Sequence, residues 1–242
     1  MPKIEFIGKT DVGLIRPNNE DTFVVNGKAS YCLVADGMGG AAAGETASQI
    51  FAQTADEIFA DSAPRTEQDV LACVQSTFRH ANDRILSHVA EHPEHQGMGC
   101  TAELLAFTTS GFVIGHMGDS RTYRFREGVL KQLTKDHSLV QDQIDQGLIT
   151  EEQARTHSMR NVILRAVGVR PSPALDTLRG PVYQGDIFLL CSDGLTDLVE
   201  DSEINGVLNL NGDLGLKSEH LIDLAKKAGG KDNITVVLAE VG

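Results

Sequence analysis

The sequence predicts a single α+β domain in which strands and helices form separate layers. Segments with the two-residue period of strands and segments with the helical period come in blocks, without the regular alternation that builds a parallel sheet. The 242 residues suffice for one large domain with a sizeable core, and no internal repeat, low-complexity tract or Pro/Ser-rich linker divides them. We therefore expect one domain that covers residues 1–242.

The N-terminal part predicts one buried strand followed by two long helices. The wholly apolar run Tyr31–Ala35 predicts the strand, and the glycine-rich turn after Asp36 leads into a helix over about residues 45–60. A second helix is expected from Thr66, where Asp69 completes a capping box. Both helices are expected to cover a sheet.

The middle of the chain changes to the strand period. Short turns rich in glycine and serine separate the segments, which we interpret as a β-meander. The predicted strands are Thr101–Phe107, Phe112–Met117, Arg121–Phe125 and Val129–Leu133. A small helical insertion follows, with one helix over Ser138–Gln146 and the capped start of another at Thr150.

The C-terminal part predicts two buried strands with two helices between them. Asp186–Cys191 and Ile234–Val241 are the apolar segments. Helices are expected over about Ser202–Leu210 and Ser218–Ala228.

Composition excludes several functional classes. With 21 basic and 34 acidic residues the formal net charge is −13, which repels nucleic acid. No apolar run approaches the roughly 20 residues of a membrane span, and the N-terminus lacks the features of a secretory signal. We expect a cytoplasmic protein without a nucleic-acid or membrane partner. The cysteines, which we expect to be reduced packing residues, are Cys32, Cys73, Cys100 and Cys191.

The most informative feature is a set of aspartates at the ends of apolar strands. Asp36, Asp119 and Asp193 each follow such a strand, and Asp232 precedes one. Because buried carboxylates without partners are costly, this repetition suggests a shared cation. Oxygen ligands favour a hard ion such as Mg²⁺ or Mn²⁺. A sheet that aligns these strand ends would place the carboxylates in one cleft.

A fifth motif, at residues 16–21, adds an arginine and two acids. Arg16 offers paired donors that suit phosphate oxygens, and Glu20 and Asp21 follow it closely. Gly37 would let the backbone approach an ion, so its carbonyl is a plausible ligand. Two hard cations about 3.5–4 Å apart activate water and clamp both oxygens of an in-line displacement at phosphorus. The motifs therefore predict hydrolysis of a phosphate ester.

These motifs, in this order, resemble those of the metal-dependent type 2C protein serine/threonine phosphatases (the PPM family), in the form of a bacterial single-domain member. The resemblance covers nearly the whole chain, from Thr10 to Thr235. It implies a four-layer α-β-β-α sandwich, with two central antiparallel sheets flanked by helices. It also implies an enzyme that hydrolyses phosphoserine and phosphothreonine in proteins by attack of a metal-bridging water or hydroxide, and that opposes a cognate protein kinase acting on the same substrates. We expect the protein to be a monomer.

The resemblance implies a role for each acid of the core site. Asp36 would bridge two Mn²⁺ or Mg²⁺ ions. Asp193 and Asp232 would bind one of them, and the Gly37 carbonyl would bind the other.

Further roles follow from the same resemblance. Glu20 and Asp21 would act mainly by holding metal-bound waters, and Arg16 would bind the phosphate. Asp119, together with Asp193, matches a weaker third metal site.

Residues 134–166 resemble the family's mobile flap, which includes Asp136, His137 and Ser138. Met38 stands where animal members carry a histidine that is the proposed general acid. Since methionine cannot donate a proton, either a metal-bound water or another side chain must protonate the leaving group. His137 is the nearest motif histidine.

Each of these residues also has an ordinary structural explanation. An aspartate before glycine is most often a turn residue, and Arg16 could be a plain surface cation. His88, His92 and His95 gather near a helix end, where solvation or the helix dipole explains them better than a metal does. His116, inside an apolar strand, is expected to be a satisfied core residue.

Two other functions are compatible with the same motifs. One is a pseudophosphatase that binds phosphoproteins without hydrolysing them. Such a protein would be expected to lack one or more of the metal-binding carboxylates, whereas this sequence has a carboxylate at each of these positions. The other is a phosphatase of a partner-switching pathway, which would differ only in its substrate.

Overall fold

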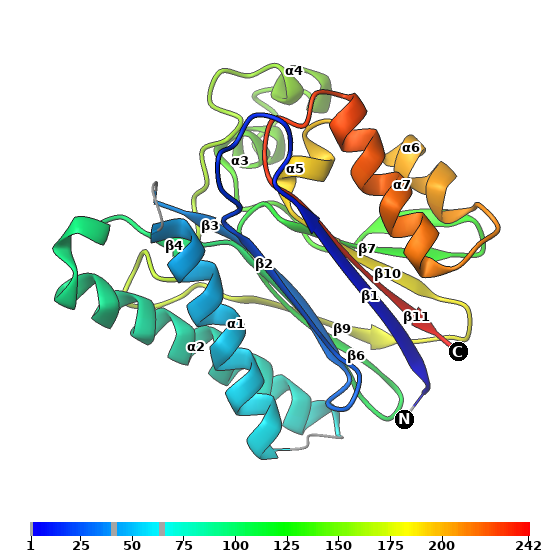
Figure 1. Ribbon diagram of the computed structural model, residues 1–242, viewed down its shortest axis with the longest axis horizontal. Coiled ribbons are helices and arrows are strands. Elements are labelled where there is room, and N and C mark those ends of the chain that lie inside the picture. The colour runs from blue at the N-terminus through cyan, green and yellow to red at the C-terminus, as the bar shows by residue number, and fades with distance from the viewer. Residues whose placement is uncertain (1, 40–42, 63–65) are drawn as a thin grey trace.

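Two antiparallel β-sheets pack face to face in the computed structural model, which describes residues 2–39, 43–62 and 66–242, and helices cover both outer faces (Figure 1). One sheet has the strand order β1-β11-β10-β7-β8, and the other has the order β2-β3-β5-β6-β9 with β4 paired to β3. This confirms the predicted four-layer sandwich.

The strands of the first sheet are β1 (Ile4–Asp11), β7 (Arg121–Arg126), β8 (Val129–Gln132), β10 (Ile187–Cys191) and β11 (Ile234–Val241). Those of the second are β2 (Asp21–Asn26), β3 (Tyr31–Met38), β4 (Gly99–Cys100), β5 (Ala102–Phe107), β6 (Gly111–Met117) and β9 (Asp176–Pro181). The helices are α1 (Ala43–Ser62), α2 (Glu67–Glu91), α3 (Leu139–Asp145), α4 (Glu151–Arg155), α5 (Asp193–Thr196), α6 (Asp201–Leu208) and α7 (Leu214–Lys227), with a 3₁₀ turn η1 (Pro93–His95).

The central strands are apolar on both faces because each face is covered. In β3, Leu33 and Ala35 pack towards α1 and α2, whereas Cys32 and Val34 pack into the core between the sheets. Phe188 of β10 supplies the other side of that core. This explains why the strands appear in the sequence as continuous apolar runs.

Helices α1 and α2 cover the second sheet, and α5, α6 and α7 cover the first (Figure 1). The capping box of Thr66 and Asp69 at the start of α2 is confirmed. Phe51 and Phe78 join α1 to α2 edge to face, with ring centroids 4.9 Å apart. None of the helices in the described part of the chain has the length and apolar character that crossing a membrane requires.

Two predictions about elements were wrong. The meander is not continuous, because β6 and β7 lie in different sheets and the chain crosses between them at Gly118, whose φ is 117°. Helix α7 begins at Leu214 rather than at Ser218, because the Asp213 side chain accepts a hydrogen bond from the backbone N–H of Leu216 (2.8 Å) and caps the first turn.

Strands β1, β2 and β9 were not anticipated, and each is paired along its length with a predicted strand. The four cysteines are free and buried, as expected.

The helical insertion carries α3 and α4 to one end of the sandwich, beside α5 and the loop between β1 and β2 (Figure 1). Its two ends are joined by short antiparallel contacts. Leu139 N–H donates to the Val162 carbonyl (2.9 Å), and Leu164 N–H donates to the His137 carbonyl (2.7 Å). The insertion is therefore closed at its base.

Candidate metal centre

The strand ends of the two sheets bring the predicted acids together. Asp21 opens β2 directly opposite Asp36 on β3. Asp193 opens α5 after β10, and Asp232 lies just before β11. Asp119 lies where the chain crosses between the sheets. Segments far apart in the sequence thus meet at one end of the sandwich.

Close backbone contacts, made possible by glycines, bring these segments near one another. A Cβ on Gly37 would lie 2.0 Å from the Gly44 carbonyl oxygen, so only glycine lets β3 run against the start of α1. A Cβ on Gly194 would lie 1.9 Å from the Asn233 carbonyl oxygen, at the contact between α5 and the start of β11. Each glycine therefore allows a contact beside a predicted ligand.

Asn233 fixes the loop that carries Arg16 and Glu20. Its Oδ1 accepts a hydrogen bond from the Glu20 N–H (2.8 Å). Its Nδ2 donates to the carbonyls of Val12 (3.0 Å) and Asn18 (2.8 Å). The sequence analysis did not assign this role, although an asparagine directly after a predicted metal ligand is a signal that could have indicated it.

Asp21 is held in place by hydroxyl groups from the opposite sheet. Its Oδ2 accepts hydrogen bonds from Ser192 Oγ (2.8 Å) and Thr235 Oγ1 (2.6 Å). Neither hydroxyl residue was predicted as part of the site, but both are polar residues in or beside apolar strands. They fix the orientation of the carboxylate and leave its Oδ1 without a hydrogen-bond partner.

The carboxylates repel one another. Burial raises the pKa of Asp36 well above its ordinary value, and the nearby charges of Asp21 and Asp193 raise it further. Burial and then Asp119 and the neighbouring acids raise the pKa of Asp193. For Asp21, burial raises the pKa to about 6 even though hydroxyl groups donate to it.

Asp119 belongs to the same electrostatic cluster. Burial, followed by the charges of Asp136 and Asp197, raises its pKa to about 7. For Glu20, burial raises the pKa, while Arg16 opposes the shift. Such a concentration of acids is stable in the charged form only with added positive charge.

The residues present fit a divalent cation. Among the described residues, Oδ1 of Asp21, Asp119 and Asp193 is buried without a hydrogen-bond partner, which is the condition that a hard ion would relieve. No three acid, histidine or cysteine side chains in the described ranges already form a closed ligand shell. The carboxylates are thus neighbours whose side chains must rotate to share an ion.

Arg16 is a cation that lies directly against a predicted metal ligand. Its Nη2 donates to Asp232 Oδ2 over 2.7 Å, and the Arg16 side chain is 50% exposed. The hydrogen bond to Asp232 raises the pKa of the Arg16 guanidinium, and the charges of Glu20 and Asp193 raise it further. Arg16 therefore lies at the rim of the site and can move.

The three predicted flap residues lie at the base of the insertion and hold it together. Asp136 accepts a two-point contact from Arg121 (Nε–Oδ1 2.9 Å, Nη2–Oδ2 2.7 Å). Ser138 caps α3 by accepting from the Gln141 N–H over 3.3 Å. These contacts stabilise the insertion and leave the two side chains engaged outside the acid cluster.

The interactions of His137 do not suit a proton donor to the leaving group. Its Nδ1 accepts from the Gly118 N–H (3.2 Å), and its Nε2 lies 3.2 Å from Asp176 Oδ2. Burial and then the neighbouring His116 lower the pKa of His137 to about 4, so its ring is neutral near pH 7. The ring instead ties the insertion to the backbone beside Asp119.

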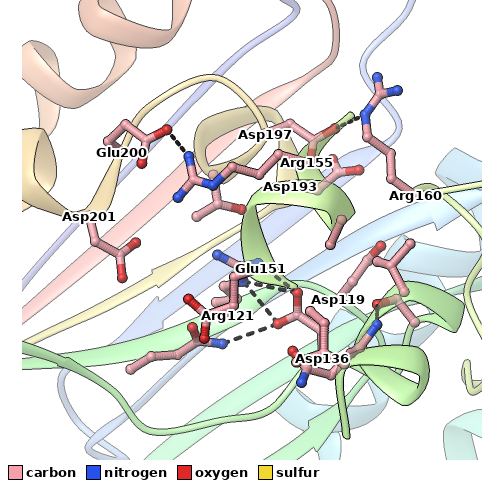
Figure 2. Close-up of a pocket in the computed structure, with 17 residues that line it drawn as sticks. Asp119, Arg121, Asp136, Glu151, Arg155, Arg160, Asp193, Asp197, Glu200 and Asp201 are labelled. Carbon is pink, nitrogen blue, oxygen red and sulfur yellow. Dashed lines mark hydrogen bonds and ion pairs between the residues drawn. The ribbon is translucent and has the colours of Figure 1, made fainter. Parts of the chain in front are cut away.

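A cavity of about 410 Å³ separates the insertion from α5 and α6, and Asp119 and Asp193 line it (Figure 2). Two ion pairs join its walls. Arg155 pairs with Glu200, and Arg160 Nε lies 3.8 Å from Asp197 Oδ2. The cavity is open to a polar ligand beside the acid cluster.

Known proteins are similar to this chain over nearly its whole length. A family model described as Protein phosphatase 2C matches residues 16–214. The Mycobacterium tuberculosis serine/threonine protein phosphatase PstP is 40% identical over 98% of this chain, which spans only 45% of that relative's length. The Listeria innocua serine/threonine phosphatase stp is 37% identical, over 96% of this chain and 94% of the relative.

Solved structures of phosphatases are also similar to this chain. The crystal structure of Mycobacterium tuberculosis PstP has a TM-score of 0.92 with 36% identity and covers 98% of both chains. A structure of the PstP catalytic domain with a TM-score of 0.89 and 36% identity, covering 98% of both chains, contains two manganese ions. The geometry of the acids and these similarities lead to one conclusion: the chain belongs to the protein phosphatase 2C family.

Proposed function

We propose that this protein is a Mn²⁺- or Mg²⁺-dependent phosphatase that removes phosphate from phosphoserine and phosphothreonine in proteins. The observation that carries the proposal is the buried acid cluster with unpartnered oxygens on Asp21, Asp119 and Asp193. The manganese ions in the PstP structure support the choice of metal.

In this proposal Asp36, Asp193, Asp232 and the Gly37 carbonyl would hold the ions of the core site. Asp119 and Asp193 provide a weaker third site. When bound, the ions supply positive charge and lower the pKa of coordinated water.

The chain's own residues position the substrate and order the site. Glu20 and Asp21 would accept hydrogen bonds from water at the ions. The hydroxyl groups of Ser192 and Thr235 engage Asp21 Oδ2 and leave its buried Oδ1 available for such a bond. Arg16 binds phosphate oxygens once it leaves Asp232, and its exposure at the rim permits this exchange. Two anions, Asp232 and the substrate, thus compete for one guanidinium.

We further propose that the insertion at residues 134–166 is a flap that contacts the protein part of the substrate. The cavity beneath it and the ion pairs of Arg155 with Glu200 and of Arg160 with Asp197 support this role. A cognate Ser/Thr protein kinase that phosphorylates the same substrates is part of the proposal, as is a monomeric state.

Hydrolysis of a phosphothreonine peptide tests the function. We expect turnover with Mn²⁺, none with EDTA, and nearly complete loss in Asp36→Asn. Asp83→Asn, an exposed aspartate on α2, is the matched control and should keep full activity. Activity that survived complete chelation would rule out the mechanism, and phosphopeptide binding without turnover under saturating Mn²⁺ would indicate a pseudophosphatase.

A further inference from the structure

Three histidines at the C-terminal end of α2 lie with their rings in mutual contact. The ring centroids of His88 and His92 are 4.5 Å apart, those of His88 and His95 are 5.1 Å apart, and those of His92 and His95 are 5.8 Å apart. Solvation or the helix dipole would explain each histidine alone but does not require the rings to gather. The three residues therefore need an explanation as a group.

The backbone holds this group in place. The N–H of His92 donates to the His88 carbonyl (2.8 Å), and the N–H of His95 donates to the His92 carbonyl (2.9 Å). His88 lies in the last turn of α2, His92 is the residue that caps the C-terminus of this helix, and His95 lies in η1. The imidazoles thus start from fixed positions on a helix end and the next turn.

Ring nitrogens already meet within this group. His88 Nε2 lies 2.9 Å from His95 Nδ1, so one proton joins two lone pairs. Two imidazole nitrogens bound to one tetrahedral Zn²⁺ lie about 3.3 Å apart, given bonds of 2.0–2.1 Å. A cation could therefore replace this proton if the two nitrogens move apart by a few tenths of an ångström and both rings turn their lone pairs towards it.

The third ring has a carboxylate partner of the kind that metal-bound histidines have. His92 Nδ1 lies 3.3 Å from Glu94 Oε1. A carboxylate that accepts the proton of one ring nitrogen leaves the lone pair of the other nitrogen free for a metal. A histidine binds a metal through its neutral ring, so binding releases any proton that the ring carries at that nitrogen.

We propose that His88, His92 and His95 form a second cation site that binds a borderline divalent metal of the Zn²⁺, Ni²⁺ and Cu²⁺ class. Imidazole nitrogens favour these metals, whereas the carboxylates of the acid cluster favour hard ions. Among the described residues, no three histidine, cysteine or acidic side chains are placed to hold a metal ion as they stand, so binding requires the three histidine rings to rotate. His92, with a side chain 47% exposed, is free to turn towards the other two.

The site is connected to the strand that carries Asp36 and Gly37. The Met98 N–H donates to the His95 carbonyl (3.1 Å), and Met98 is buried. The next residues form β4, in which Gly99 pairs with Met38 and Cys100 pairs with Gly37. A metal on the three histidines would therefore restrain the loop that supports β3.

Titration calorimetry with ZnCl₂ tests the site, in protein that already contains excess Mg²⁺ to occupy the acid cluster. Loss of a residue that only orients a metal ligand costs about 10- to 100-fold in affinity, so each of His88→Gln, His92→Gln and His95→Gln should weaken the Zn²⁺ event at least about tenfold. His80→Gln, an exposed histidine on the same helix, should leave it unchanged.

Two further measurements show whether a loss of Zn²⁺ affinity comes from the three histidines or from misfolding. Thermal unfolding without metal identifies any variant that is misfolded, and histidine-ring NMR of the wild type should show that ZnCl₂ shifts the rings of His88, His92 and His95 but not that of His80. The affinity should fall as the pH is lowered through 6.5, since protons compete for imidazole. Equal Zn²⁺ affinity in all four variants, or ring shifts that bypass the three histidines, would overturn the proposal. Neither calorimetry nor NMR depends on phosphatase activity, so this test is independent of the proposed function.

Discussion

Replacement of Asp119 by asparagine should make the metal-free protein more stable. Asp119 is buried with an unpartnered Oδ1, and burial together with Asp136 and Asp197 raises its pKa from 3.8 to about 7. Between these values the folded chain binds a proton that the unfolded chain has lost. Stability therefore falls as the pH rises through this window and stays low above it.

The magnitude follows from the same shift. At 1.36 kcal/mol for each pKa unit, the ionised Asp119 costs the folded state up to about 4 kcal/mol above pH 7. Asparagine keeps the shape and removes the charge, so we expect the free energy of unfolding to rise by about 2 kcal/mol or more at pH 8, and to change little near pH 4.

Urea unfolding in EDTA at several pH values measures this effect, with the exposed Asp83→Asn as the control. The advantage of Asp119→Asn should shrink when Mn²⁺ is added, because a bound cation favours the charged carboxylate. A variant that is equally or less stable than the wild type at pH 8 in EDTA would refute the electrostatic reasoning.

Two further predictions concern single side chains. Arg16→Ala should lower kcat/KM for a phosphopeptide by at least about tenfold, and Arg16→Lys should restore only part of it because an ammonium cannot hold two phosphate oxygens; steady-state kinetics that match the wild type would remove Arg16 from the site. His116→Gln should lower the free energy of unfolding by about 3–5 kcal/mol, because buried Glu103 loses its cationic partner and keeps only the hydrogen bond from Thr122. Since Glu103 helps to raise the pKa of His116 to about 9, that contribution is complete below pH 6.5 and is lost as the pH rises through 9, which urea unfolding across this range would show.

The elements that are buried on both faces were predictable from the sequence. Continuous apolar runs gave β3, β10 and β11, and the acids that end or precede these strands lie together as expected. The edge strand β9 was not predictable, since Asp176–Pro181 has charged residues, a glycine and a proline, and only its pairing with β6 makes it a strand. Strand β1 is half-buried along most of its length and shows no clear period.

The arrangement of the sheets could not be predicted from local pattern. Turns of similar composition follow β5 and β6, yet the first closes a hairpin and the second, at Gly118, carries the chain into the other sheet. In the same way, the acids were evident from the sequence, but the groups that hold them were not. Asn233, Ser192 and Thr235 act only because the fold places them against residues more than 170 positions away.

The anomalous scattering of crystals soaked in MnCl₂ tests the central claim most directly. We expect strong peaks between Asp36, Asp193 and Asp232, within the 2.0–2.6 Å at which oxygen binds hard divalent ions. Manganese sites that lie elsewhere, or no peaks among these carboxylates at saturating MnCl₂, would contradict it.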